Sequence, residues 1–128
     1  MITFTKNSAW DLFPIPLDQV RGAVMGLLVN GEQPVMAFKT VRDQLVFTNK
    51  RIISIDVQGI TGRRKSFTSL PYSKIQFFAI QTPGFAELVP DSELVIMFAN
   101  GFTATYEFKG RVDISVIGRM ISEYVLSR

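Results

Sequence analysis

The chain has 128 residues, of which 47% are apolar, 12% aromatic and 20% charged, and its formal net charge is +3. This length and composition suit one domain with a hydrophobic core and exclude an intrinsically disordered chain. Cysteine and histidine are both absent, which excludes disulfides, thiolate metal sites, cysteine nucleophiles and every catalytic site that needs imidazole.

The two ends of the chain are expected to fold differently from its middle. Residues 1–16 contain Pro14 and Pro16, which oppose a helix and favour an extended N-terminal extension. Apolar residues at helical spacing then predict a helix over residues 17–28, ended by Asn30 and Gly31. A second apolar stripe predicts a C-terminal helix over residues 112–125.

Between these helices, short apolar runs alternate with turn signals and predict seven strands. Asn100-Gly101 is the strongest hairpin signal of the chain. Short connections require antiparallel pairing, because parallel pairs need long crossovers. We therefore expect a mainly β fold, a seven-stranded antiparallel bent barrel with a C-terminal capping helix and an extra N-terminal helix. One domain would span residues 17–128. The predicted strands are residues 35–41, 45–48, 51–57, 63–70, 74–82, 93–99 and 102–109.

This order of elements is that of pleckstrin-homology (PH) domains. The amino-acid sequence resembles that of the bacterial pleckstrin-homology family of small stand-alone proteins. The resemblance covers roughly residues 17–126. It is carried by RDQLVFTNKRII at residues 42–53, DVQGITGRRK at 56–65, LPYSKI at 70–75, and by EFK, VDI and ISEYVL between residues 107 and 126.

The resemblance implies more about fold than about function. Members of the family look like scaffolds that assemble into rings, which implies a homo-oligomer, possibly ring-shaped, with an unknown protein partner. Eukaryotic PH domains often bind phosphoinositides through a Lys-x(n)-Lys/Arg-x-Arg pattern in the first hairpin. Here that hairpin offers Lys39 and Arg42 with no basic-x-Arg after them, and this departure argues against phosphoinositide binding.

Positive charge gathers in the middle of the chain, where residues 33–75 have a net charge of +6, against −1 before them and −2 after them. Such a bias attracts phosphates or acidic partners. The candidate ligand-binding residues are Lys50, Arg51, Arg63, Arg64 and Lys65. A solvated face, or charges that protect an edge strand, explains the same residues without a ligand.

The N-terminal apolar residues are surplus to a closed barrel with its capping helix. They either cover their own barrel or meet another subunit, because large exposed apolar patches mark interfaces. The candidate interface residues are Trp10, Phe13, Leu17, Val20 and Val24.

These observations predict a non-enzymatic PH-like scaffold or protein-interaction module that self-associates. The alternative is binding of an anionic ligand or a membrane surface through the basic strands of residues 50–65. Nucleic-acid binding is disfavoured, because most phenylalanines near the basic third alternate at strand spacing and belong to the core. We expect no cofactor and no metal. A chain without a signal peptide or an apolar stretch of about 18 residues is expected in the cytoplasm.

Overall fold

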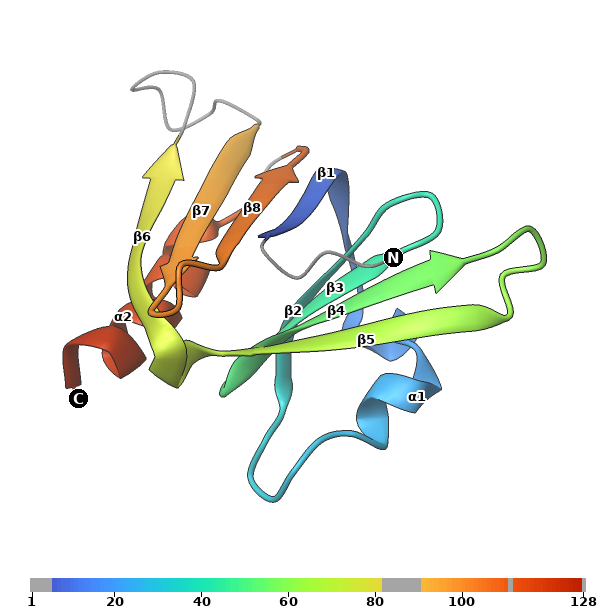
Figure 1. The fold of residues 1–128 in the computed structure, drawn as a ribbon, viewed down its shortest axis with the longest axis horizontal. Coiled ribbons are helices and arrows are strands. Elements are labelled where there is room, and N and C mark those ends of the chain that lie inside the picture. Colours follow the sequence, from blue (N-terminus) through green and yellow to red (C-terminus); the bar gives the residue numbers. More distant parts are fainter. Residues whose placement is uncertain (1–5, 82–90, 111, 128) are drawn as a thin grey trace. The chain divides into compact units, whose positions relative to one another are not determined.

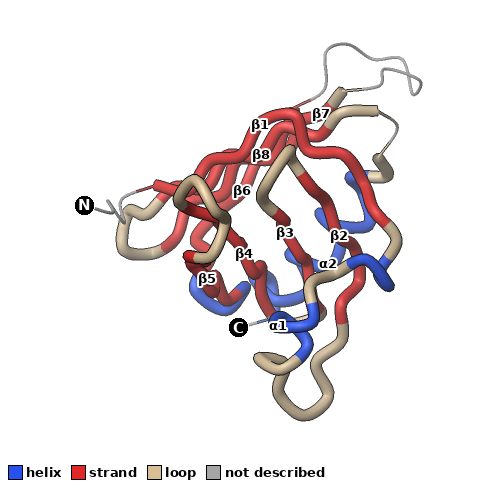
Figure 2. Tube along the Cα trace, turned by 90° about the vertical axis from the view of Figure 1, so that its right-hand side faces the viewer, coloured by secondary structure: helices blue, strands red, loops and turns tan. Residues whose placement is uncertain are grey.

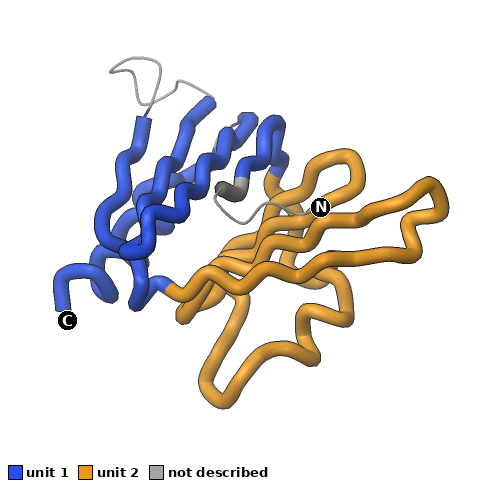
Figure 3. The backbone as a smooth tube through the Cα atoms, in the orientation of Figure 1, with its two compact units in different colours: residues 1–13, 72–128 blue, residues 14–71 orange. Residues whose placement is uncertain are grey.

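The computed structural model describes residues 6–81, 91–110 and 112–127 of the chain. These residues form two compact units, one made of residues 1–13 and 72–128 and the other of residues 14–71 (Figure 3). We call them unit 1 and unit 2.

Unit 2 is an antiparallel sheet of four strands in the order β5-β4-β3-β2. Each strand follows its neighbour in the chain through a short turn (Figure 1), as the sequence predicts. The strands are β2 (Pro34–Lys39), β3 (Gln44–Thr48), β4 (Arg51–Gln58) and β5 (Arg64–Pro71).

Both faces of this sheet carry buried apolar side chains. Leu45, Phe47 and Ile52 lie on one face. The other face is covered by the segment that precedes β2, which consists of the 3-10 turn η1 (Leu17–Gln19) and the single helical turn α1 (Gly22–Met25). This cluster packs Val20 and Val24 of the segment with residues of β2, β3 and β4, namely Ala37, Val46, Ile53 and Ile55.

The predicted helix over residues 17–28 is therefore wrong in length, although its buried positions Val20 and Val24 do face the sheet. Gly22 and Gly26 lie inside the predicted helix, and each costs about 1 kcal/mol relative to alanine in a helix. The chain keeps one helical turn, which suffices to bring the two valines over the strands.

Unit 1 contains four strands in the order β1-β8-β7-β6. β6 (Ile75–Gln81), β7 (Ser92–Phe98) and β8 (Thr103–Phe108) are antiparallel, and their registers place Tyr106 opposite Leu94. The short 3-10 turn η2 (Tyr72–Lys74) precedes β6, and helix α2 (Ile114–Ser127) follows β8. Strands cover more of the trace in Figure 2 than helices do, which agrees with the predicted mainly β class.

Strand β1 (Lys6–Ile15) was not predicted as a strand. It pairs with β8 in parallel, from Lys6 beside Thr103 to Leu12 beside Phe108. The described strands therefore number eight rather than seven, and one pair is not antiparallel. Parallel pairing is possible here because the whole chain between the two strands serves as the connection.

Helix α2 packs on β6 and on η2. Ile117 and Ile121 are buried, and the ring of Tyr124 lies 5.4 Å from that of Tyr72, measured between centroids. A Cβ on Gly118 would stand 2.8 Å from Cδ1 of Ile80. Gly118 thus lets the helix approach the strand more closely than any other residue would.

The first prediction concerns this helix. Ile121→Ala should lower the free energy of unfolding by roughly 2–5 kcal/mol, because it leaves a cavity in a closely packed site. Leu126, which is 81% exposed on the same helix, is the matched control, and Leu126→Ala should change stability by less than about 0.5 kcal/mol. Urea unfolding measures both. Equal losses in the two variants would show that α2 does not depend on its buried face.

Candidate functional site

The five predicted anion-binding residues lie at opposite ends of one hairpin. Lys50 and Arg51 stand at the start of β4, whereas Arg63, Arg64 and Lys65 lie where β5 begins, paired with the end of β4. Eight residues of strand separate these ends by roughly 25 Å. The structure therefore divides the predicted site into two separate groups of cations, which one small ligand cannot bridge.

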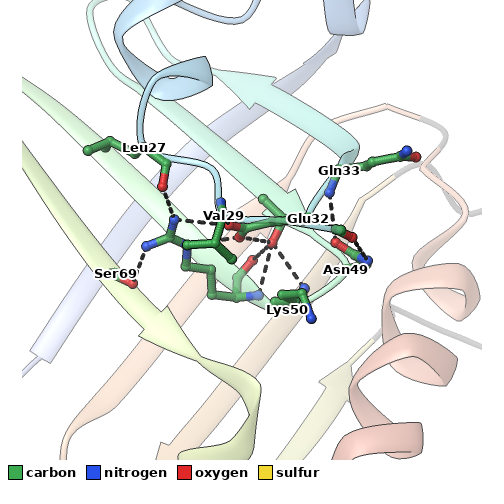
Figure 4. Close-up of polar contacts among 10 residues, drawn as sticks. Leu27, Val29, Glu32, Gln33, Asn49, Lys50 and Ser69 are labelled. Atoms are coloured by element: carbon green, nitrogen blue, oxygen red, sulfur yellow. Dashed lines mark hydrogen bonds and ion pairs between the residues drawn. The ribbon is translucent and has the colours of Figure 1, made fainter.

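Arg51 is held inside unit 2 by the buried carboxylate of Glu32, a residue labelled in Figure 4. Its Nε donates to Oε2 of Glu32 at 2.8 Å and its Nη2 to Oε1 at 3.0 Å, a bidentate pair. The same guanidinium donates to the Leu27 carbonyl at 2.7 Å and to Oγ of Ser69 at 3.1 Å. The side chain of Glu32 has no exposed surface. The geometry gives Arg51 a structural role, and the neighbouring Lys50 is exposed.

Two further donors complete the surroundings of Glu32. Oγ1 of Thr48 donates to Oε2 at 2.7 Å, and the backbone N–H of Val29 donates to Oε1 at 3.0 Å. Burial alone would raise the pKa of Glu32, but the hydrogen bonds from Arg51, Thr48 and Val29 and the charge of Arg51 outweigh it and hold the pKa below its usual value. The carboxylate is thus charged at neutral pH and fixes residues 27–33 to β3, β4 and β5.

The other three cations gather at the turn between β4 and β5, which we call the hairpin tip (residues 59–65). Arg63, Arg64 and Lys65 are exposed, and among the described residues none of them forms an ion pair. Ile60 is fully exposed at the same turn. The tip therefore presents one large apolar side chain and three exposed cations.

The base of the hairpin tip is fastened to the turn between β2 and β3. Nη2 of Arg42 donates to the Gly59 carbonyl, and the N–H of Val57 donates to Oδ1 of Asp43 at 2.8 Å. Burial, with the nearby charge of Asp43, raises the pKa of Asp56. These contacts fix the turn from which the tip projects.

The five predicted interface residues divide between surface and core. Val20 and Val24 are buried in unit 2, so their side chains cover their own sheet. Leu17 is 44% exposed, and Trp10 and Phe13 are each 52% exposed. The exposed members therefore belong to β1 and to η1.

A bulge in β1 places Trp10 and Phe13 on one face of the sheet. Ala9 pairs with Tyr106 and Leu12 pairs with Phe108, so one extra residue stands between the two pairs. Asp11 has a φ of 56°, which an aspartate tolerates in such a bulge. Tyr106, Phe108 and Leu12 are buried, and the aromatic residues that follow Ala9 and Leu12 therefore point to the opposite, outer face.

Carboxylates gather beside these aromatic residues, and the sequence does not predict this cluster. Nζ of Lys109 lies 3.1 Å from Glu107, 3.4 Å from Asp91 and 3.6 Å from Asp11. The hydrogen bond to Glu107 raises the pKa of Lys109, with further support from Asp91. Glu93 lies directly across from Glu107 on the neighbouring strand. These acids come from β1, β7, β8 and the approach to β7, so spacing in the sequence gives no signal for them.

The family model for the bacterial PH domain matches residues 4–125, nearly the whole chain. The chain belongs to the bacterial PH domain family. It is 50% identical over 70 residues to the uncharacterized protein YjqA of Bacillus subtilis (strain 168), a match that spans 54% of that relative. It is also 36% identical over 101 residues to the uncharacterized protein YozO of the same strain, covering 79% of this chain and 85% of YozO.

Solved structures agree with the family and with the predicted PH-like fold class. A DUF1696 family protein with a pleckstrin-homology domain from Shewanella loihica PV-4 has a TM-score of 0.73 and 30% identity, over 91% of this chain and 99% of that one. A pleckstrin-homology domain from Shewanella amazonensis SB2B has a TM-score of 0.60 and 33% identity, over 88% and 90% of the two chains. The family prediction is therefore confirmed.

Residues 6–81, 91–110 and 112–127 contain no group of three or more acidic side chains arranged to hold a metal ion. Within the same ranges, no helix is long and apolar enough to cross a membrane.

The second prediction concerns Glu32 and Arg51. Arg51→Met should lower the free energy of unfolding by about 3 kcal/mol at neutral pH, because it leaves a buried carboxylate without its counter-charge. In the native protein the depressed pKa of Glu32 stabilises the fold above the ordinary glutamate pKa, and this contribution is lost as the pH falls through the lowered value. The difference between the two proteins should therefore shrink on acidification. Urea unfolding at several pH values measures it.

The exposed neighbour Lys50 supplies the control for this experiment. Lys50→Met removes a cation from the same turn and should change stability by less than about 0.5 kcal/mol at every pH. If the loss of unfolding free energy in the Arg51 variant is the same at every pH, Arg51 does not act by stabilising the charged form of Glu32.

Proposed function

We propose that this protein is a non-enzymatic interaction module that self-associates, and that Trp10 and Phe13 of β1 lie in the contact. The observation that carries the proposal is the bulge at Asp11, which brings two half-exposed aromatic side chains to one face of the sheet. Aromatic residues dominate the energetics of protein interfaces. Two of them on adjacent outward positions are a costly surface for a chain that stays alone in water.

Among the other candidate interface residues, Leu17 is exposed in unit 2, whereas Val20 and Val24 are buried against the unit 2 sheet. The two valines hold the segment of residues 17–25 on its own sheet, and Leu17 remains at its exposed edge. In this arrangement the interface side chains are presented by fixed elements. Little conformational entropy is then lost when the copies associate.

The third prediction tests self-association. Trp10→Ser combined with Phe13→Ser should reduce the particle mass to that of one chain at a concentration where the native protein is larger. Point substitutions are preferable to removal of the N-terminus, because β1 is a strand of the unit 1 sheet. Light scattering measures the mass, and far-UV circular dichroism checks that the variant is folded.

Leu126→Ser is the matched control, since this residue is a large, strongly exposed apolar side chain on another element. It should leave the mass of the assembly unchanged. A native protein that stays monomeric at high micromolar concentration would overturn the proposal.

A second candidate function is favoured by the hairpin tip. Three exposed cations that form no ion pair with any described residue are suited to bind an anionic ligand or an anionic membrane surface. Lys50 and Arg51 do not share this site with the tip.

The fourth prediction tests this candidate by sedimentation with vesicles rich in anionic lipid. If the tip binds them, binding at low salt should disappear in the Arg63→Gln/Arg64→Gln/Lys65→Gln variant and in native protein at about 1 M salt, where charges are screened within about 3 Å. Lys50→Gln is the control and should bind as the native protein does. Equal sedimentation of native and triple variant at low salt would exclude the tip as the binding site.

A further inference from the structure

Strand β5 is the outermost strand of unit 2 (Figure 1). Among the described residues, the sheet order places β4 on one side of β5 and no strand on the other. The side chains of Lys65, Phe67 and Ser69 are exposed along it. An edge strand of this kind offers backbone N–H and C=O groups with which another extended chain can pair.

The backbone of Arg51 shows which residues of β5 face the open edge. Its N–H donates to Oγ1 of Thr48 at 3.0 Å, and its carbonyl accepts from the same hydroxyl at 3.1 Å. Both groups therefore turn toward β3. The partner of Arg51 on β5 is Pro71, which has no N–H to donate. The pair of Arg51 with Pro71 is thus one without backbone hydrogen bonds.

The rest of β5 follows from this pair. Hydrogen-bonded and non-hydrogen-bonded pairs alternate along an antiparallel ladder, and the pairing of β4 with β5 has no register shift along its length. The N–H of Val57 agrees with the alternation, since it donates to Asp43 beside β3. Counting back by twos from Pro71, the residues whose N–H and C=O groups turn away from β4 are Ser69, Phe67 and Lys65.

The segment that precedes β2 adds an apolar rim to this edge. Arg51 donates from Nη2 to the Leu27 carbonyl at 2.7 Å and from Nη1 to Oγ of Ser69 at 3.1 Å, so one guanidinium joins the segment to β5. Leu27 and Ser69 are both labelled in Figure 4. Phe67 pairs with Ile55, which packs under the segment, so Phe67 lies on the same face. Leu27 is 44% exposed and Phe67 is 38% exposed.

Positive charge marks the end of β5 nearest the hairpin tip. Lys65 continues the row of Phe67 and Ser69 on one face, and Arg64 lies on the other face. Both are exposed, and neither forms an ion pair with any described residue. Such charges keep an edge from pairing with neutral or basic strands, and they attract a chain that carries carboxylates at the same position.

The edge is also held in place before anything binds. Arg51 is fixed by both carboxylate oxygens of Glu32, and the contacts of Arg42 and Asp43 fasten the base of the hairpin tip. Little conformational entropy of this protein is then lost when a second chain pairs with β5.

We propose that the open edge of β5 binds an extended acidic peptide segment of a partner protein, which pairs with β5 as an additional strand. Backbone hydrogen bonds to Lys65, Phe67 and Ser69 hold the peptide, and its side chains determine specificity. In antiparallel pairing, the more stable kind, the C-terminal end of the peptide lies beside Lys65. Acidic residues belong at that end, and β-branched apolar residues belong opposite Phe67 and Ser69.

The arrangement of the cations favours a peptide over a lipid headgroup. Because Arg64 and Lys65 leave opposite faces of the strand, they cannot converge on a single phosphate. Successive side chains of an extended peptide also leave opposite faces, so two neighbouring carboxylates of the peptide can each meet one of the cations. The site lies wholly in unit 2 and does not depend on the self-association proposed through β1.

Residue-resolved amide hydrogen exchange tests the proposal with a defined probe. The probe is a capped peptide as long as β5, in which valine alternates with threonine and the last three residues are Glu-Asp-Glu. At about ten times its Kd, it should slow exchange at Lys65, Phe67 and Ser69 about tenfold, because the bound fraction does not exchange. Exchange at Ser66 and Thr68, whose N–H groups turn toward β4 in the same alternation, should not change.

Matched peptides and variants test the charge. The same peptide in reversed order, with the acidic residues first, should bind about fivefold more weakly, because its carboxylates lie far from Arg64 and Lys65. The variant Arg64→Glu/Lys65→Glu should lose binding of the acidic peptide and gain binding of one that ends in Lys-Arg-Lys. Lys50→Glu changes a cation at the far end of the hairpin and should keep the native preference.

Each outcome decides the proposal. Binding of the acidic peptide without slower exchange at Phe67 and Ser69 would overturn strand addition, and so would a lack of binding at about 1 mM peptide. Sedimentation with anionic vesicles that requires Arg64 and Lys65, in a protein that does not bind the peptide, would assign the cations to a membrane surface instead.

The result is also separable from the proposed self-association. The variant Trp10→Ser/Phe13→Ser should bind the peptide as the native protein does, because its substitutions lie on β1 of unit 1. A native protein that is monomeric and binds the peptide would overturn self-association alone. A native protein that assembles and does not bind the peptide would overturn this inference alone.

Discussion

The buried carboxylate of Glu32 is the interaction on which unit 2 depends. Four donors surround it, two of them from the guanidinium of Arg51, one from Thr48 and one from the backbone of Val29. Because these donors come from the turn between β3 and β4 and from the segment before β2, the ion pair ties the covering segment to the sheet. At the other end of that segment, the Gln44 side chain accepts a hydrogen bond from the N–H of Arg21 and donates one to the Gln19 carbonyl. Val20 and Val24 are held between these two fastenings.

This arrangement explains how a segment with one helical turn can cover a sheet. A short helix is only marginally stable in water. Forming its first turn fixes the backbone dihedral angles of several residues, and this loss of conformational entropy exceeds the free energy gained from the hydrogen bond of that turn. Here the hydrogen bonds of Glu32 and Gln44 stabilise the segment, which is too short to be stabilised by helical cooperativity. A buried ion pair adds little stability over an apolar substitute, but the loss of one partner is costly. In this protein the ion pair between Glu32 and Arg51 positions the segment, because it specifies which face of the segment meets the strands.

Elements with a local signal were predictable and those with a distant partner were not. Strands β2 to β8 follow from alternation and from turn residues such as Asn100 and Gly101, and α2 follows from its apolar stripe. Pro14 and Pro16 predict an extended chain but give no signal for its pairing with β8, so β1 could not be recognised as a strand of the sheet. Glu32 and Arg51 are 19 residues apart, and no spacing rule joins them. The concentration of positive charge in the sequence predicted one site that contains both Lys50 and Lys65, whereas the β4–β5 pairing places them at opposite ends of the hairpin.

The bulge at Asp11 has a consequence for how related sequences are compared. Ala9 and Leu12 are three positions apart in β1, whereas the residues they pair with on β8, Tyr106 and Phe108, are two positions apart. The bulge therefore accommodates one extra residue in β1. A relative that lacks this residue would have a regular strand and would still place the equivalents of Trp10 and Phe13 on one face. A single-residue gap inside a strand, which usually signals a misalignment, would therefore be a correct alignment here. The aromatic pair can lie on one face with either of two spacings, and a search for one fixed interval between the two residues would find only one of these arrangements.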